Sequence, residues 1–307
     1  MRRKMIAGIV LGLVALSIML AFVLCDRDRP PRQTGLDRGK VGVIYIEGAI
    51  AAGRYDSGVL GGGGSSEVIA AALRKAARNP EIDAVVIRLN SPGGTPAASQ
   101  EIGLEVERLK QSGKKVVASM GDVAASGAYW VAACADQIVA NPGTMTGSIG
   151  VIMQTPNLQG LYDKLGVDTE TFKSGAHKDM GSPSRAVTPE ERAIFQSMID
   201  DIFSQFIDAV AKGRHKDVLE VRQLADGRVF TGRQAKELGL VDRLGDFHDA
   251  VLLAGELAGI PGEPVIAELG PKNVWRDIFG NPWESVLSRL GLAAFTGLET
   301  SYPFNLR

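Results

Sequence analysis

The sequence has few of the residues on which metal and redox chemistry in proteins depends. Among 307 residues there are three histidines and two cysteines, Cys25 and Cys134. Cys25 ends an apolar segment and Cys134 lies in a predicted buried helix, so a disulfide framework is not expected. The sequence also lacks CxxC and HExxH spacings. A metal site built from protein side chains therefore has little support.

An excess of charge of either sign is also missing. Lys and Arg number 34 and Asp and Glu number 35, which gives a formal net charge of −1. A chain without a basic excess gives no reason to propose nucleic acid as a partner. The hydrophobic fraction of 45% and the charged fraction of 22% are ordinary for a globular protein, and the length allows a substantial buried core.

The longest uncharged stretch lies at the N-terminus. Residues 5–25 carry no charge and follow Arg2, Arg3 and Lys4. As a helix, this segment has a length of about 30 Å, which matches the hydrocarbon core of a bilayer. The alternatives are a cleaved signal peptide and a lipoprotein that uses Cys25. Both require small residues before a cleavage point. The residues before Cys25 are bulky, so we predict an uncleaved anchor.

Five parts are predicted along the chain: a cytoplasmic N-terminus at 1–4, a transmembrane anchor at 5–25, a polar linker at 26–39, a globular domain at 40–262 and a tail of unknown role at 263–307. The positive charges before the anchor favour a cytoplasmic N-terminus, although arginines in the linker weaken this asymmetry. We therefore expect a single-pass protein of the cell membrane whose globular domain lies outside the cytoplasm.

Apolar, β-branched runs alternate with helical patterns from residue 40 onward. The predicted strands are 40–50, 84–90, 114–121 and 137–142, and the helices between them are 65–80, about 97–112 and a helix after 126. Continuously apolar strands that alternate with helices indicate an α/β fold with a parallel sheet covered on both faces. The Gly- and Ser-rich stretches SPGG, GDVAASG and PGTMTGSIG follow strands. We expect these loops to converge at one edge of the sheet, where sites form in such folds.

A long amphipathic helix is predicted over 188–214. Thr188 and Glu191 form a capping box, and Pro189 suits the first turn. The apolar stripe of this helix is interpreted as part of the core, and the length of the helix also makes it a candidate contact between subunits. A helix, a short strand and a second helix are predicted over 231–260.

Ser126 stands where a predicted strand gives way to a predicted helix. On local grounds, tight packing is a better interpretation of this small residue than catalysis. A serine nucleophile needs a base. His177 is the one histidine in a glycine-rich loop, and Lys173 and Lys178 lie in the same loop. A lysine can serve as the base when it is neutral, which requires desolvation because its reference pKa is ~10.4.

Acyl transfer to a serine also needs backbone N–H groups that hold the developing oxyanion. Gly93 and Gly94 follow Pro92 and allow a substrate carbonyl to approach the backbone closely. Gly127 follows Ser126 at a predicted helix start, where N–H groups have no partner within the helix. The PGG sequence alone fits an ordinary turn equally well.

Four stretches together resemble the bacterial signal peptide peptidase A family, in its short form. They are RLNSPGGTP (88–96), SMGDVAASGAYWVAACADQIVANPGTMTGSIGV (119–151), FKSGAHKDMGSPSR (172–185) and VFTGRQAKELGLVD (229–242). The resemblance covers roughly residues 40–260 and implies a Clp-protease/crotonase-like fold. It also implies that the domain at 40–262 is a Ser–Lys serine peptidase that requires no metal or other cofactor.

The resemblance gives roles to five positions. Ser126 in AASGAYW matches the nucleophile, and Lys178 in SGAHKD matches the general base. Gly93 in SPGG matches an oxyanion donor, and the N–H of Gly127 is its companion. Ser148 in TGSIGV matches a serine that hydrogen-bonds the lysine and orients it.

The implied reaction is hydrolysis of remnant signal peptides and similar apolar peptides through an acyl-enzyme, by a homo-oligomeric ring above the membrane. His177 matches no catalytic position. Asp179 adjoins Lys178, and its carboxylate is expected to point away, because neighbours in an extended loop face opposite sides. The sequence leaves open whether Ser126 and Lys178 of one site come from one subunit or from two.

Two alternative functions remain. A crotonase-fold acyl-transfer enzyme would explain the PGG loop, but not the set of Ser126, Lys178 and Ser148. A non-catalytic membrane scaffold would retain the fold without the chemistry. An active-site serine probe distinguishes the peptidase from both alternatives.

Overall fold

The computed structural model describes residues 39–53 and 64–270. The predicted anchor at 5–25 lies outside these residues, as do nearly all of the linker and most of the tail. Within the two described ranges, none of the helices combines the length and the hydropathy that a membrane span requires.

The strands are β1 (Lys40–Glu47), β2 (Ile50–Ala51), β3 (Gly64–Ser65), β4 (Ile82–Ser91), β5 (Lys115–Ala125), β6 (Gln137–Ala140), β7 (Met145–Gly147), β8 (Val229–Thr231), β9 (Arg243–Leu244) and β10 (Val265–Glu268). The helices are α2 (Ser66–Arg78), α3 (Pro96–Gln111), α4 (Gly127–Ala133), α5 (Gln159–Leu165), α6 (Pro189–Arg214), α7 (Val218–Leu224), α8 (Gly232–Glu237) and α9 (Phe247–Ala258). The strands and helices predicted from the apolar runs are confirmed, with ends shifted by a few residues.

The main sheet has the strand order β10-β1-β4-β5-β6-β9, and each neighbouring pair in this order is parallel. β7 extends the sheet from the end of β5 in parallel and pairs with β8 in antiparallel fashion. β10 comes from the predicted tail at 263–307 and adds an edge strand beside β1. Because β4 and β5 are central neighbours, the loops that follow them lie at the same edge of the sheet.

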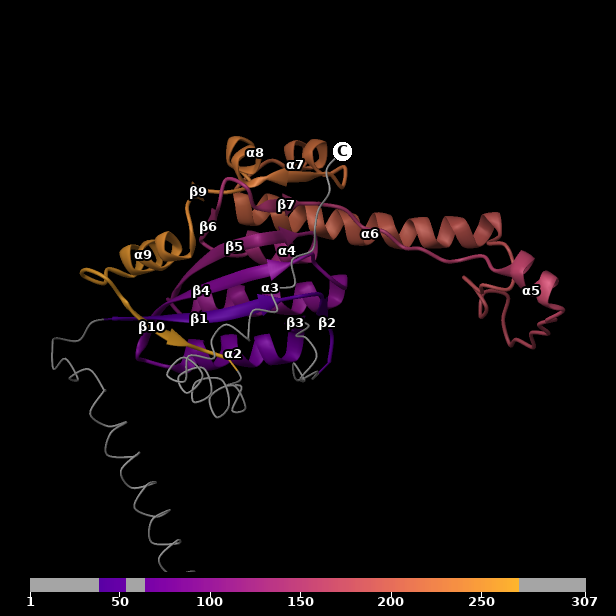
Figure 1. Ribbon diagram of the computed structural model, residues 1–307, viewed down its shortest axis with the longest axis horizontal. Coiled ribbons are helices and arrows are strands. Elements are labelled where there is room, and N and C mark those ends of the chain that lie inside the picture. The colour runs from indigo at the N-terminus through magenta and orange to yellow at the C-terminus, as the bar shows by residue number, and fades with distance from the viewer. Residues whose placement is uncertain (1–38, 54–63, 271–307) are drawn as a thin grey trace, which may run out of the picture. The chain divides into compact units, whose positions relative to one another are not determined.

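Helices cover both faces of this sheet, as the sequence predicted (Figure 1). Alternate residues of β4 point to opposite faces, so Ile87 packs with Leu73 of α2 and Ile102 of α3, whereas Val86 packs with Leu253 of α9. All of these side chains are buried. The mixed α/β fold with a helix-flanked parallel sheet is therefore confirmed.

The two halves of helix α6 lie in different environments. Its predicted capping box is present, because the Thr188 side chain accepts from the backbone of Glu191 and Glu191 accepts from Thr188. Its last turns pack on α4, where the rings of Trp130 and Phe206 stack with centroids 4.7 Å apart. In its first half Met198 is 45% exposed. The interpretation of the whole apolar stripe as core is thus wrong for the first half of α6, which extends beyond the helices on the sheet (Figure 1).

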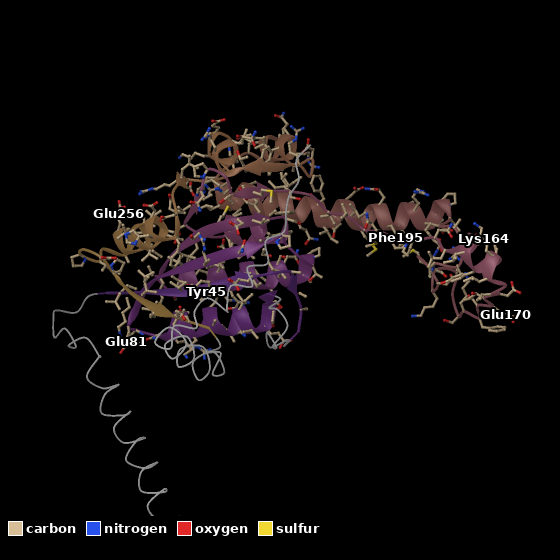
Figure 2. The ribbon with its side chains drawn as sticks, in the orientation of Figure 1. Tyr45, Glu81, Lys164, Glu170, Phe195 and Glu256 are labelled. Carbon is tan, nitrogen blue, oxygen red and sulfur yellow. The ribbon has the colours of Figure 1, made fainter. Side chains whose placement is uncertain are left out.

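Residues 151–202, which we call the arm, comprise α5, the loops around it and the first half of α6. In Figure 2, Lys164 and Glu170 lie at the outer end of the arm, and Phe195 lies on the part of α6 that leads there. Apolar side chains are unusually exposed on the arm, since Ile152 is 85%, Phe172 87% and Leu165 66% accessible. A surface of this kind is typical of a contact with another molecule.

Candidate active site

Ser126 connects β5 to α4 with a backbone conformation that residues other than glycine rarely adopt. Its φ is 53° and its ψ is −124°, as at the first central position of a type II′ turn. The turn is fixed because the Ser126 N–H donates to the Gly147 carbonyl at 2.8 Å and the Ser126 carbonyl accepts from Trp130 at 3.0 Å. The Ser126 hydroxyl does not cap α4. A strained serine on a strand-to-helix turn, with its hydroxyl uncommitted, has a geometry that is typical of nucleophiles and that packing alone does not require.

The loop after β4 lies directly against this turn. Gly93 has φ of 104°, and a Cβ atom added there would lie 2.8 Å from Ser126 Cβ, from the Ala125 carbonyl oxygen and from the Gly127 nitrogen. The Gly127 N–H, in the first residue of α4, has no partner within the helix. The structure therefore brings together Gly93, Ser126 and Gly127, which were predicted as the two oxyanion donors and the nucleophile.

The Gly93 N–H already has a partner in this state of the protein. It donates to the hydroxyl oxygen of the buried Ser91 at 3.1 Å, while the Gly93 carbonyl accepts from the Ile50 N–H at 2.8 Å. To hold an oxyanion, the Gly93 N–H must exchange Ser91 for the substrate oxygen. The sequence reasoning missed Ser91, for which the only signal was its place two residues before Gly93.

Ser148 lies beside the Ser126 turn, immediately after β7. Gly147, whose carbonyl accepts from the Ser126 N–H, is its neighbour in the chain. Ser148 also has a positive φ, of 51°, and its N–H donates to the Arg228 carbonyl at 2.8 Å. Two strained serines are thus linked through one peptide unit.

Lys178, in contrast, lies on the arm. It is exposed, and the residues on either side of it are tied to the start of α6, because His177 Nε2 lies 3.5 Å from Glu190 and Asp179 pairs with Arg185. Arg185 in turn binds Glu191 in the first turn of α6. The Lys178 loop is therefore anchored at the outer end of this helix.

Ser126 lies near the other half of α6, through its contact with α4. It is hydrogen-bonded to Trp130, which stacks on Phe206. Glu191 and Phe206 are separated by about four helical turns, or ~22 Å. One chain consequently does not bring Lys178 within hydrogen-bonding distance of Ser126.

The carboxylates near Lys178 are engaged by other cations. Asp179 accepts from Arg185 Nε at 3.0 Å and from Lys173 Nζ at 2.8 Å, so both oxygens of its carboxylate are hydrogen-bonded to other cations. These hydrogen bonds, with that from Arg185 the stronger influence, hold the pKa of Asp179 well below its usual range. Hydrogen bonds from Arg185 and from the Thr188 backbone lower the pKa of Glu191 to about 2.

A strained serine at the carboxyl edge of a parallel sheet, with two glycines of the adjoining loop and helix start beside it, is an arrangement typical of serine hydrolases. Comparison with known proteins narrows this class. Residues 108–261 match the model of Peptidase family S49. A protein of Synechocystis sp. named "Putative protease slr0021" is 41% identical over 259 residues, which cover 83% of this chain and 89% of that protein.

Two longer relatives are also named as proteases. Protease 4 of Salmonella typhi is 39% identical over 230 residues, 75% of this chain but 36% of its own length. The chloroplastic serine protease SPPA of Arabidopsis thaliana is 34% identical over 225 residues, 73% of this chain and 33% of its own length. The chain therefore belongs to peptidase family S49 and is a serine protease. The family predicted from the four sequence stretches is confirmed.

Proposed function

We propose that the protein cleaves peptide bonds through an acyl-enzyme in which Ser126 is the nucleophile and Lys178 is the general base. The strained Ser126 turn against Gly93 is the observation that carries this proposal. Neutral Lys178 Nζ takes the proton of Ser126 Oγ as the oxygen bonds to the substrate carbonyl carbon. The N–H groups of Gly93 and Gly127 hold the oxyanion, and Gly93 releases Ser91 to do so.

The second half of the reaction uses the same groups. Lys178 gives its proton to the leaving amine as the C–N bond breaks, which leaves an ester on Ser126. A water molecule then attacks the ester while Lys178 takes a proton from it, and Ser126 Oγ recovers a proton as the acid leaves. Ser148 orients the amine by one hydrogen bond without adding charge. These steps need only protein groups and water.

We infer that Lys178 acts on the Ser126 of another copy. The separation of the two residues along α6 supports this inference, and so do the exposed apolar residues Ile152, Leu165 and Phe172 of the arm. A second copy is an occupant that would bury these side chains and bring Lys178 to a Ser126 turn. Because the contact joins different surfaces of two identical chains, it can repeat around a closed ring.

The proposed substrates are apolar peptides such as remnant signal peptides, and the proposed location is the cell membrane. The uncharged segment 5–25 after three cationic residues supports a single-pass anchor with the catalytic domain outside the cytoplasm. The resemblance to signal peptide peptidases supports the substrate class.

A serine-directed fluorophosphonate probe tests the chemistry. It should label the wild type and fail to label Ser126→Ala, whereas Ser112→Ala, which alters an exposed serine at the end of α3, should label normally. Lys178→Arg should be inactive because an arginine stays protonated. Hydrolysis of an apolar peptide ester by pure Ser126→Ala protein, or by Lys178→Arg, would contradict the proposal.

A further inference from the structure

Three acidic side chains belong to the segment that carries Lys178 or contact it. Asp179 is its neighbour in sequence, and Glu190 and Glu191 reach the same segment from the first turn of α6. A carboxylate within about 4–6 Å of an amine favours the ammonium form and shifts the ionisation by 1–3 pH units. The proposed base therefore works only if these carboxylates are held by other groups.

Two of the three acids have such a partner, and the third lies beside an imidazole that is charged only when protonated. Glu190 lies 3.5 Å from His177 Nε2, Asp179 accepts from Lys173 and Arg185, and Glu191 accepts from Arg185. In the part of the chain that the structure describes, the Lys178 amine itself has no hydrogen bond or ion pair. The charged and titratable groups of this segment that pair with one another are Lys173, His177, Asp179 and Arg185 from the loop and Glu190 and Glu191 from α6.

Arg185 connects most of this arrangement. Its Nε donates to Asp179 Oδ2 at 3.0 Å, its Nη1 donates to Glu191 Oε2 at 2.9 Å and its Nη2 donates to the Asp179 backbone carbonyl at 3.2 Å. Both carboxylates are nearly covered, with 14% of the Asp179 side chain and 3% of the Glu191 side chain exposed. One guanidinium thus fixes the side chain and the backbone of the residue next to Lys178, which needs the planar fork of arginine.

We propose that Arg185 is a positioning residue for the base. It holds the Asp179 carboxylate in a hydrogen bond, so that Lys178 reaches Ser126 without a carboxylate partner. It also fixes the direction of the loop through the Asp179 backbone. Lys173 assists from the other oxygen of Asp179. The inference rests on the proposed function, because it requires Lys178 to act as the base. It assigns Arg185 no contact with the substrate.

Removal of the guanidinium should change the pH profile rather than only the rate. In Arg185→Met the Asp179 carboxylate loses its strongest partner and becomes available to Lys178. The neutral amine then forms only at higher pH. The rising limb of the pH profile of kcat/KM, along which the base loses its proton, should therefore move to higher pH by about 1–3 units. In Asp179→Asn/Arg185→Met that carboxylate is absent, so the limb should return toward the wild-type position.

The experiment uses the full-length protein in detergent and measures hydrolysis of an apolar peptide ester from about pH 6 to 10, a range that begins near the usual titration of His and ends just below that of Lys. Arg243→Met is the matched control, because it removes an exposed arginine from a 3.5 Å pair with Glu256 on the other side of the sheet. This control should keep the wild-type limb. Thermal unfolding and sedimentation of each variant show whether fold and assembly are retained.

An unshifted limb in Arg185→Met would overturn the inference, and so would a shift that the added Asp179→Asn change does not reverse. If Arg185→Met does not fold, Arg185→Lys provides the test. Lysine keeps the positive charge but lacks the planar guanidinium that binds several acceptors at once. The rising limb of the pH profile should therefore shift in the same direction by less than about one pH unit. An unchanged pH profile would refute the role of Arg185. Failure of the underlying mechanism looks different, because Lys178→Ala would then remain active.

Discussion

Replacement of Gly93 with alanine should inactivate the enzyme without unfolding it. A Cβ atom at Gly93 would lie 2.8 Å from Ser126 Cβ, from the Ala125 carbonyl oxygen and from the Gly127 nitrogen. Two of these neighbours are backbone atoms, which cannot rotate aside. Either the loop after β4 or the Ser126 turn must move, and both movements separate the nucleophile from the oxyanion donors.

Gly113 offers a matched control for the backbone strain. Its φ of 92° resembles the 104° of Gly93, but a Cβ atom there would meet nothing within 4 Å. Gly113→Ala should therefore lose about 1–2 kcal/mol of unfolding free energy from its positive φ alone. Gly93→Ala should lose at least as much, and it should also lose about 10²–10³ in kcat, which is the effect of removing one oxyanion donor.

The assay combines ester hydrolysis with urea unfolding of both variants. We expect Gly113→Ala to keep the wild-type kcat despite its lower stability, whereas folded Gly93→Ala should be nearly inactive. A folded Gly93→Ala with kcat close to that of the wild type would refute the placement of the oxyanion site. Equal inactivation of both variants would show that general strain, rather than the contact with Ser126, is responsible.

Three further predictions concern strain, acid stability and membrane orientation. Ser126→Gly and Ser126→Ala should both be inactive, but the glycine variant should be more stable by about 1 kcal/mol, because it relieves the φ of 53°; equal urea midpoints would argue against a strained turn. Since Arg185 lowers the pKa of Glu191 from its ordinary 4.5 to about 2, this pair stabilises the protein above pH 4.5, and its contribution is lost as the pH falls toward 2. The melting temperature of the wild type should thus fall more over this window than that of Arg185→Met, and parallel curves would exclude the pairing as a source of stability. Protease added to spheroplasts should digest the catalytic domain, whereas digestion only after lysis would reverse the proposed orientation.

Most of the fold could be predicted because its signals are local. Continuous apolar runs identified the central strands, and the Thr188 and Glu191 capping box located the start of α6. β10 could not be predicted from its four residues, since an edge strand of this length is defined only by its pairing with β1. The exposed first half of α6 was also missed, because an apolar stripe has the same period whether it faces its own core or another molecule.

The site could be predicted in part for a similar reason. Ser126 and Gly93 follow the neighbouring parallel strands β5 and β4, so their proximity follows from the sheet. The hydrogen bond from Gly93 to Ser91 depends on the local course of the loop, which the spacing does not reveal. The separation of Lys178 from Ser126 depends on the direction of α6, which is a tertiary property. The catalytic roles of these residues remain predictions.

The most direct test of the proposed shared site mixes two inactive variants. Ser126→Ala retains Lys178, and Lys178→Ala retains Ser126, so a complete pair can form only between different copies. If the variants are co-expressed with different affinity tags and assemble at random, about one quarter of the sites should hold both residues. We predict recovery of about that fraction of wild-type hydrolysis in assemblies that carry both tags, with each variant inactive alone. Purified mixed assemblies without activity would contradict a site shared between subunits.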